Sequence, residues 1–170
     1  MPPPNLNGAE VEYLYGQLGP ALVLFALSIT GDRARAQDAV HQVFLKMIEK
    51  PNLGAVADMK AYLFTCVRNA ILNDAKTRQR SVALCEEVAW FEPPHRDYAA
   101  ELNLRRALYL LPDDQREVVV LHVWGGLTFL QIAEVLRISS NTAASRYRYA
   151  LSRLRESMFT KEDSCANPSR

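Results

Sequence analysis

Residues 127–149 read LTFLQIAEVLRISSNTAASRYRY, and this stretch decides the fold of the second half of the chain. Thr128 and Gln131 are spaced as a capping box, which predicts a short helix that begins after Thr128. Ser139 or Ser140 can cap a second helix. Two short helices joined by a turn, the second rich in arginine, predict a helix-turn-helix. The expected bounds are 128–136 for the first helix, 137–139 for the turn and about 142–158 for the second helix.

The side chains of the second helix of this pair suit binding to duplex DNA. Its first turn offers small polar side chains and free backbone N–H groups, which suit a phosphate or a base edge. Positions 135–155 hold five arginines and no acidic residue, whereas solvated surface helices, the alternative, usually mix both signs of charge. Because Arg146 and Arg148 lie about 200° apart on a helix, we assign Ser145 and Arg148 to the base-facing side and Arg146 to a flanking phosphate or an ion pair within the domain. The candidate duplex-binding residues are Ser140, Asn141, Thr142, Ser145, Arg146 and Arg148.

Composition excludes several classes of protein. The 170 residues are 49% hydrophobic and 23% charged, as in a soluble globular protein of one domain or two small ones. The odd set of three cysteines contains no C-x-x-C pair, so we expect a reducing cytosol and no disulfide framework. No nucleophile elbow, phosphate-binding loop or dinucleotide glycine motif is present, and the three histidines are not at metal-ligand spacing, which indicates structural roles for them. We therefore expect no enzyme, no cofactor and no metal site.

The sequence also favours a cytoplasmic protein without membrane insertion. The longest apolar run, 21–29, is much shorter than the roughly 20 residues that span a bilayer. The first residues, MPPPNLNG, lack the basic and apolar stretches of a signal peptide.

Charge and periodicity divide the chain into two helical domains. Apolar spacing in the first eighty residues is helical, with a first helix ended by Gly31, a second capped by Asp32 and stopped by Pro51, and a third that starts near Asp58. In the second half, Pro112 suits the first turn of a helix that Gly125 and its neighbour end. We expect an all-α fold with these parts: a helical domain over 1–80, an acidic linker over 81–100, a helix-turn-helix domain over 101–160 and a disordered tail over 161–170.

A second basic segment lies at 60–80. It holds five basic residues and only one acid, together with aromatic and amide side chains, and this mixture suits single-stranded bases that stack and form hydrogen bonds. Equally, Tyr62 and Phe64 can be core residues, and the charge run can be a solvated helix end. The candidate strand-binding residues are Lys60, Tyr62, Arg68, Asn69, Asn73, Lys76, Arg78 and Arg80.

Four segments, in order, resemble the extracytoplasmic-function (ECF) sigma factors of bacterial RNA polymerase. Residues 36–46, AQDAVHQVFLK, are similar to the region 2.2 signature, and residues 61–69, AYLFTCVRN, to regions 2.3 and 2.4. Residues 111–122, LPDDQREVVVLH, are similar to the opening of region 4, and residues 127–146 complete its helix-turn-helix. The chain departs from the usual family residues at Tyr62, Asn73, Arg137 and the pair Ala143-Ala144.

The resemblance implies a sigma factor that binds core RNA polymerase and promoter DNA, and it leaves an anti-sigma partner open. It implies that region 2.2 docks on the polymerase through Asp38, Gln42, Phe44, Leu45 and Lys46, that Asp38, Gln42 and Lys46 are exposed, and that Val40, Val43 and Met47 face inward. It also implies that region 2.4 reads and melts the −10 element and that region 4 reads the −35 element as duplex. The alternative functions are a helix-turn-helix repressor or activator with a sensor domain in residues 1–80, and, more remotely, an enzyme with a DNA-binding tail.

Overall fold

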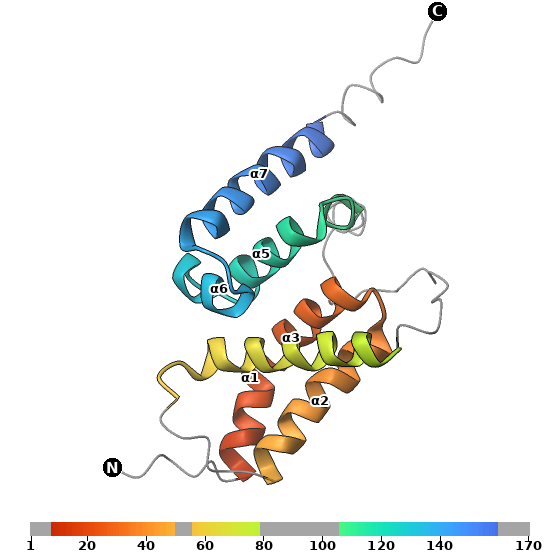
Figure 1. Ribbon diagram of the computed structural model, residues 1–170, viewed down its shortest axis with the longest axis vertical. Helices are drawn as coiled ribbons and strands as arrows, with labels where there is room; N and C mark the ends of the chain where they lie inside the picture. The colour runs from red at the N-terminus through yellow and green to blue at the C-terminus, as the bar shows by residue number, and fades with distance from the viewer. Residues whose placement is uncertain (1–7, 50–55, 79–105, 160–170) are drawn as a thin grey trace, which may run out of the picture.

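The computed structural model describes residues 8–49, 56–78 and 106–159, and these residues contain helices but no strand (Figure 1). The expected all-α fold is confirmed. The acidic linker, the C-terminal tail, Arg80, His95, Cys85 and Cys165 lie outside the described residues. The helices are α1 (Gly8–Thr30), α2 (Arg33–Glu49), α3 (Met59–Arg78), α5 (Asp113–Val123), α6 (Phe129–Leu136) and α7 (Ser140–Phe159).

Local signals end and start the first three helices as expected. Gly31 adopts a left-handed φ of 65°, which a glycine accepts without strain, and ends α1. The Asp32 carboxylate accepts a hydrogen bond from the Arg35 N–H at 3.1 Å and caps α2, and the Asp58 carboxylate accepts one from the Ala61 N–H at 3.1 Å and caps α3.

The helix-turn-helix is formed by α6 and α7. The capping box is present: the Thr128 N–H donates to Gln131 Oε1 at 2.7 Å, and the Gln131 N–H donates to Thr128 Oγ1 at 3.3 Å. Arg137 ends α6 in a left-handed conformation, with φ 57°. Pro112 is the N-cap of α5 and not its first helical residue, one position earlier than expected.

Gly125 is required where α5 turns into the next segment, because a Cβ atom there would collide with the carbonyl oxygen of Leu121. The expected end of α5 at the glycine pair is therefore confirmed. Val123, in the last turn of α5, is 52% exposed.

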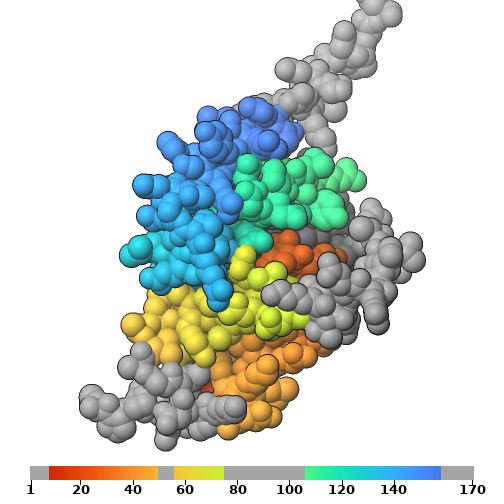
Figure 2. Space-filling model, in the orientation of Figure 1, coloured from red at the N-terminus to blue at the C-terminus, as the bar shows by residue number. Residues whose placement is uncertain are grey.

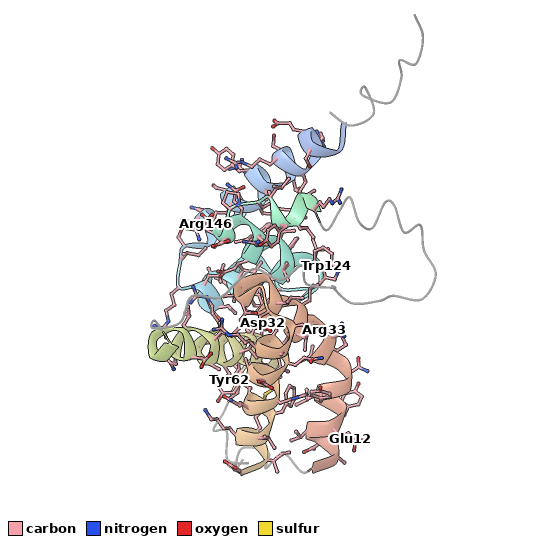
Figure 3. All side chains as sticks on the ribbon, turned by 90° about the vertical axis from the view of Figure 1, so that its right-hand side faces the viewer. Glu12, Asp32, Arg33, Tyr62, Trp124 and Arg146 are labelled. Atoms are coloured by element: carbon pink, nitrogen blue, oxygen red, sulfur yellow. The ribbon has the colours of Figure 1, made fainter. Side chains whose placement is uncertain are left out.

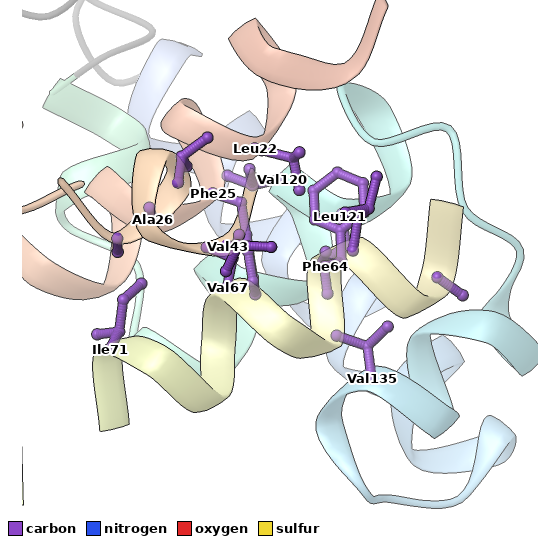
Figure 4. Packing of buried hydrophobic residues seen from close by; sticks show 14 of the residues in the cluster. Leu22, Phe25, Ala26, Val43, Phe64, Val67, Ile71, Val120, Leu121 and Val135 are labelled. Atoms are coloured by element: carbon purple, nitrogen blue, oxygen red, sulfur yellow. The ribbon is translucent and has the colours of Figure 1, made fainter. Parts of the chain in front are cut away.

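One hydrophobic core runs through both halves of the molecule. Phe25 of α1 and Phe64 of α3 are fully buried and meet edge to face with ring centroids 5.5 Å apart. Leu121 of α5 and Val135 of α6 belong to the same buried cluster (Figure 4). A smaller cluster joins residues 107–111 to α5 and α7.

The upper half (α5, α6 and α7) rests on the lower half (α1, α2 and α3), with α5 on α1 and α6 on α3 (Figures 1 and 2). By length and composition, α1 is apolar enough to cross a bilayer. The run 21–29 understated the apolar character of α1, because the glycine, proline and threonine residues that bound it interrupt the run without adding charge. In this fold α1 packs against α2, α3 and α5.

Candidate nucleic-acid interface

The first turn of α7 is held by Ser139, which settles the choice between the two candidate caps. Ser139 Oγ accepts a hydrogen bond from the Thr142 N–H at 3.0 Å and lies 2.8 Å from Thr142 Oγ1. Ser140, Asn141 and Thr142 are exposed and follow the cap directly. The helix therefore presents small polar side chains at its positive end, as a base-reading or phosphate-binding helix does.

The inner face of α7 is closely packed against α5 and α6. Ala143 and Ala150 are fully buried, whereas Ala144 is half-buried. Tyr147 meets the ring of His122 edge-on, and His122 stacks on Phe129 with ring centroids 4.7 Å apart. His122 Nδ1 lies 2.8 Å from the carbonyl oxygen of Leu127, to which it donates a hydrogen bond. The structural role predicted for His122 is confirmed.

The two central arginines of α7 point in different directions. Arg146 is labelled in Figure 3. Its Nε forms an ion pair with Asp114 Oδ2 of α5 at 3.1 Å. Arg148 is exposed, and its Nη2 donates to Ser145 Oγ at 3.4 Å. The geometry matches the ion-pair alternative for Arg146 and leaves Arg148 beside Ser145 on the outer face.

The predicted strand-binding residues of α3 are divided between two faces of the helix. Lys60 and Arg68 face the upper half: Lys60 Nζ donates to the Gly126 carbonyl oxygen at 3.2 Å, and Arg68 Nε donates to Glu117 Oε2 at 3.4 Å. Tyr62 is half-buried, and its hydroxyl lies against the Cys66 thiol one turn farther along α3. Phe64 is core, which settles the open alternative for that residue.

The remaining candidates lie farther along α3. Asn69 is half-buried and Asn73 is exposed. Lys76 and Arg78 belong to the last turns of the helix, but their side chains lie outside the described residues. The hydrogen bond between the Tyr62 hydroxyl and the Cys66 thiol raises the pKa of Tyr62, and burial raises the pKa of the Cys66 thiol. These directions indicate a structural pair and not a reactive nucleophile.

The exposed and buried residues of α2 agree with the orientation expected for this helix. Asp38, Gln42 and Lys46 are exposed, whereas Val40, Val43 and Met47 are buried. Leu45 is 57% exposed, but Phe44 is 5% exposed. The ring of Phe44 packs against Tyr15 at a centroid distance of 5.1 Å, and its predicted contact with the polymerase stays a prediction.

Tyr15 and His41 form a surface feature that sequence analysis missed. The Tyr15 hydroxyl lies 3.0 Å from His41 Nε2. Beside this pair, α1 and α2 border a groove of about 240 Å³ with mostly apolar walls, which are formed by Gly8, Val11, Glu12, Tyr15, Phe44 and Ile48. The position of Tyr15 on the expected first helix was the only indication of this feature in the sequence. Its pairing with His41 could not be predicted, because it depends on how α1 and α2 pack.

The contacts between the two halves were also missed. Besides Lys60 and Arg68, Asp58 joins the halves by accepting a hydrogen bond on Oδ2 from Gln131 Nε2. Backbone hydrogen bonding from Ala61, helped by Gln131, lowers the pKa of the Asp58 carboxyl despite its partial desolvation. Burial raises the pKa of Glu117, and the Arg68 guanidinium opposes this shift.

Within the described residues no group of histidine, cysteine and carboxylate side chains is arranged to hold a metal ion.

Comparisons with known proteins match both halves. Residues 14–81 match the family described as Sigma-70 region 2, and residues 101–154 match the family described as Sigma-70, region 4. The chain is 31% identical over 159 residues to the ECF RNA polymerase sigma factor SigL of Mycobacterium tuberculosis, which covers 88% of this chain and 89% of SigL. It is 29% identical to the ECF sigma factor EcfG of Rhodopseudomonas palustris over 79% of this chain and 77% of that protein.

Solved structures show the same fold. The sigma factor RpoE of Bartonella quintana, in complex with the anti-sigma factor NepR, aligns with a TM-score of 0.73 and 28% identity over 86% of this chain and 94% of that one. CnrH, in complex with the cytosolic domain of CnrY, aligns with a TM-score of 0.64 and 22% identity over 91% of this chain and 90% of that one.

Proposed function

The chain belongs to the ECF sigma factors of the sigma-70 family and directs promoter-specific transcription by bacterial RNA polymerase, and we propose that three helices divide this work. In this proposal α2 binds core polymerase, α3 reads and helps melt the −10 element, and α7 reads the −35 element as duplex. The domain boundaries predicted from the sequence (1–80, 81–100, 101–160 and 161–170) are part of the proposal.

The outer face of α7 is the observation that carries the assignment of duplex reading. The capped, exposed first turn offers Asn141 and Thr142, and Arg148 lies one to two turns farther along the helix. An Arg side chain reads guanine and an Asn side chain reads adenine in the major groove. Arg146 is held by Asp114, so we assign it to a flanking phosphate or to orienting the helix.

Core polymerase binding is assigned to the outer face of α2. Asp38, Gln42 and Lys46 lie four residues apart and are all exposed, so they share one side of the helix. Leu45 adds an exposed apolar side chain. We assign Phe44 a supporting role, because it packs beneath this surface against Tyr15.

Reading of the −10 element is assigned to α3. Single-stranded bases become available for stacking and for hydrogen bonds to their edges, which suits aromatic, amide and basic side chains. The residues assigned to this contact are Lys60, Tyr62, Arg68, Asn69, Asn73, Lys76, Arg78 and Arg80.

We propose that the chain acts in the cytoplasm, where bacterial RNA polymerase works, and that an anti-sigma protein regulates it. The RpoE and CnrH structures, which share the fold, are complexes with NepR and with the cytosolic domain of CnrY, respectively. A helix-turn-helix repressor or activator remains the competing interpretation of α6 and α7 taken alone.

Reconstitution with core polymerase tests the proposal. The purified chain is mixed with core RNA polymerase, the complex is isolated, and its transcripts from a library of genomic fragments are mapped. We expect co-purification and initiation at a set of promoters that core polymerase alone does not use. A chain that binds duplex DNA as a dimer but neither associates with core polymerase nor supports initiation would identify a repressor or activator instead.

A further inference from the structure

Arg146 lies at the border between the packed face and the open face of α7. It comes three residues after Ala143 and four before Ala150, and both alanines are buried, so its side chain starts near the packed face. Arg148, by contrast, is exposed and lies about 200° farther around the helix. Because α7 packs on α5 and α6 (Figure 1), the guanidinium of Arg146 comes within reach of the acidic first turns of α5.

Two carboxylates of α5 act on the charge of Arg146. Asp114 Oδ2 lies 3.1 Å from Arg146 Nε. Glu117 follows one turn farther along α5: burial raises the pKa of its carboxyl, and Arg146 is one of two arginines whose charge opposes that rise. Arg148, in contrast, donates to the uncharged hydroxyl of Ser145. The charge of Arg146 is therefore compensated from within the domain.

The ion pair between Asp114 and Arg146 is too exposed to act mainly in folding. The two side chains are 48% and 30% exposed. Ion pairs of this kind contribute little to stability, because water solvates both charges and salt screens their attraction. The carboxylate and the guanidinium still have no net charge together, so the pair lowers the positive charge at the edge of the proposed DNA-binding face.

We propose that Asp114 is a positioning residue for the −35 contact, which holds Arg146 against α5 and offsets its charge, so that Arg146 adds no phosphate contact when α7 meets duplex DNA. This inference rests on the proposed reading of duplex DNA by α7, and of the two roles assigned to Arg146 it selects orientation of the helix. A phosphate contact strengthens binding to every sequence, and a genome presents many sites without a −35 element. Compensation of Arg146 therefore limits binding to such sites, while Arg148 still reads a base.

Removal of the negative charge of Asp114 tests the proposal. Asp114→Asn leaves a side chain of the same shape beside Arg146 but no opposite charge. Binding of the full chain to a mixed-sequence, fluorescein-labelled duplex of about 20 base pairs is measured by anisotropy between about 50 and 200 mM KCl. One additional phosphate contact steepens the slope of log K against log salt by about 0.9. We therefore expect the variant to bind more tightly at low salt and to lose about threefold more affinity than wild type over this range. A slope equal to that of wild type would overturn the proposal.

Asp113 provides the matched control, because it lies in the same first turn of α5. Its carboxylate pairs with Arg116, whose side chain is 10% exposed and lies over the ring of Tyr109. Asp113→Asn removes the same charge and the same interaction with the helix dipole, but the guanidinium that it leaves is buried and cannot reach a phosphate. We expect this variant to keep the slope of wild type, with thermal unfolding showing that both variants are folded. An equal increase of the slope in both variants would refute a specific role for Asp114.

A double-mutant cycle shows whether Asp114 acts through Arg146. In a chain that carries Arg146→Ala, Asp114→Asn should leave the slope unchanged, because the charge that it would release is absent. If Asp114→Asn steepens the slope equally with and without Arg146, Asp114 repels DNA directly and the proposal is wrong.

The inference and the proposed function fail in different ways. If Arg148→Ala changes neither duplex binding nor the −35 preference of the holoenzyme, the assignment of duplex reading to α7 is wrong. If Arg148→Ala changes them and Asp114→Asn keeps the slope of wild type, only the role of Asp114 is wrong.

Discussion

Gln131 Nε2 donates a hydrogen bond to Asp58 Oδ2, and this bond joins the caps of two helices from different halves of the chain. The other carboxylate oxygen of Asp58 caps α3, and Oε1 of Gln131 completes the capping box of α6. Each residue therefore caps its own helix with one side-chain atom and forms a hydrogen bond to the opposite half with another. This relationship couples the ends of α3 and α6 to the contact between the two halves.

Exchanging the donor and the acceptor of this hydrogen bond tests the contact between the halves while both helix caps are kept. Gln131→Glu keeps the capping-box acceptor but places a second carboxylate against Asp58, so we expect a loss of about 1–3 kcal/mol in the free energy of unfolding and a larger radius of gyration. Adding Asp58→Asn supplies an amide donor and retains a good N-cap, and should recover both quantities. Chemical denaturation and small-angle scattering measure them. No recovery in the double variant would contradict the pairing.

The two central arginines of α7 should have different effects on promoter choice. Arg148→Ala should relax the preference at one −35 position, at a cost of about 1–3 kcal/mol for the preferred base, because an exposed arginine reads a base edge. Arg146→Ala should lower output from all −35 variants alike, because Arg146 is paired with Asp114. Transcription from a library of −35 variants measures both. Identical profiles, or the reverse pattern, would show that the recognition helix is oriented differently.

The outer face of α2 should control holoenzyme assembly. The double charge reversal Asp38→Lys with Lys46→Glu should weaken binding to core polymerase without unfolding the chain, because both side chains are exposed. Competition with the wild-type chain for core polymerase measures the effect, and thermal unfolding checks the fold. Glu134→Lys on α6 is the control for a charge reversal at an exposed site outside α2. A double variant that competes as well as wild type would contradict the assignment of polymerase binding to α2.

The amides of α3 should act in promoter opening. Replacing Asn69 and Asn73 with alanine should impair open-complex formation more than initial promoter binding, because an amide can bond to donor or acceptor groups on an exposed base edge. Permanganate reactivity of melted thymines measures opening, and filter binding measures the initial complex. Asn141→Ala on α7 should instead reduce the initial complex. Normal thymine reactivity in the α3 variant would contradict this role.

Arg137 should be replaceable by glycine with a gain in stability. A left-handed conformation costs an L-residue about 1–2 kcal/mol, part of which is offset by the entropy that glycine loses on folding. Arg137→Gly should therefore raise the free energy of unfolding by about 0.5–1 kcal/mol. Arg137→Ala keeps the strained conformation and should show no such gain. Equal values for the two variants would mean that the turn conformation has no measurable cost.

Some features of the candidate site could be predicted from the sequence, and others could not. The exposed row on α2 and the division between Arg146 and Arg148 could be predicted because residues on one helix are related by a fixed rotation. The inward packing of Phe44 could not be predicted, since an aromatic residue beside an exposed row of a helix can either contact a partner protein or pack against a neighbouring helix. Tyr62 and Lys60, close in sequence, lie on different faces of α3 and meet different neighbours.

The sequence by itself determined the all-α class, the helix ends at Gly31, Asp32, Asp58 and Thr128, the helix-turn-helix and the resemblance to ECF sigma factors. These depend on short-range relations, namely apolar periodicity and side-chain capping within a few residues. Only the tertiary structure decided that one core unites both halves and that Arg68 lies against Glu117, 49 positions away. Contacts over such separations depend on how whole helices pack, and a pattern of residues along one helix does not specify the surface that it meets.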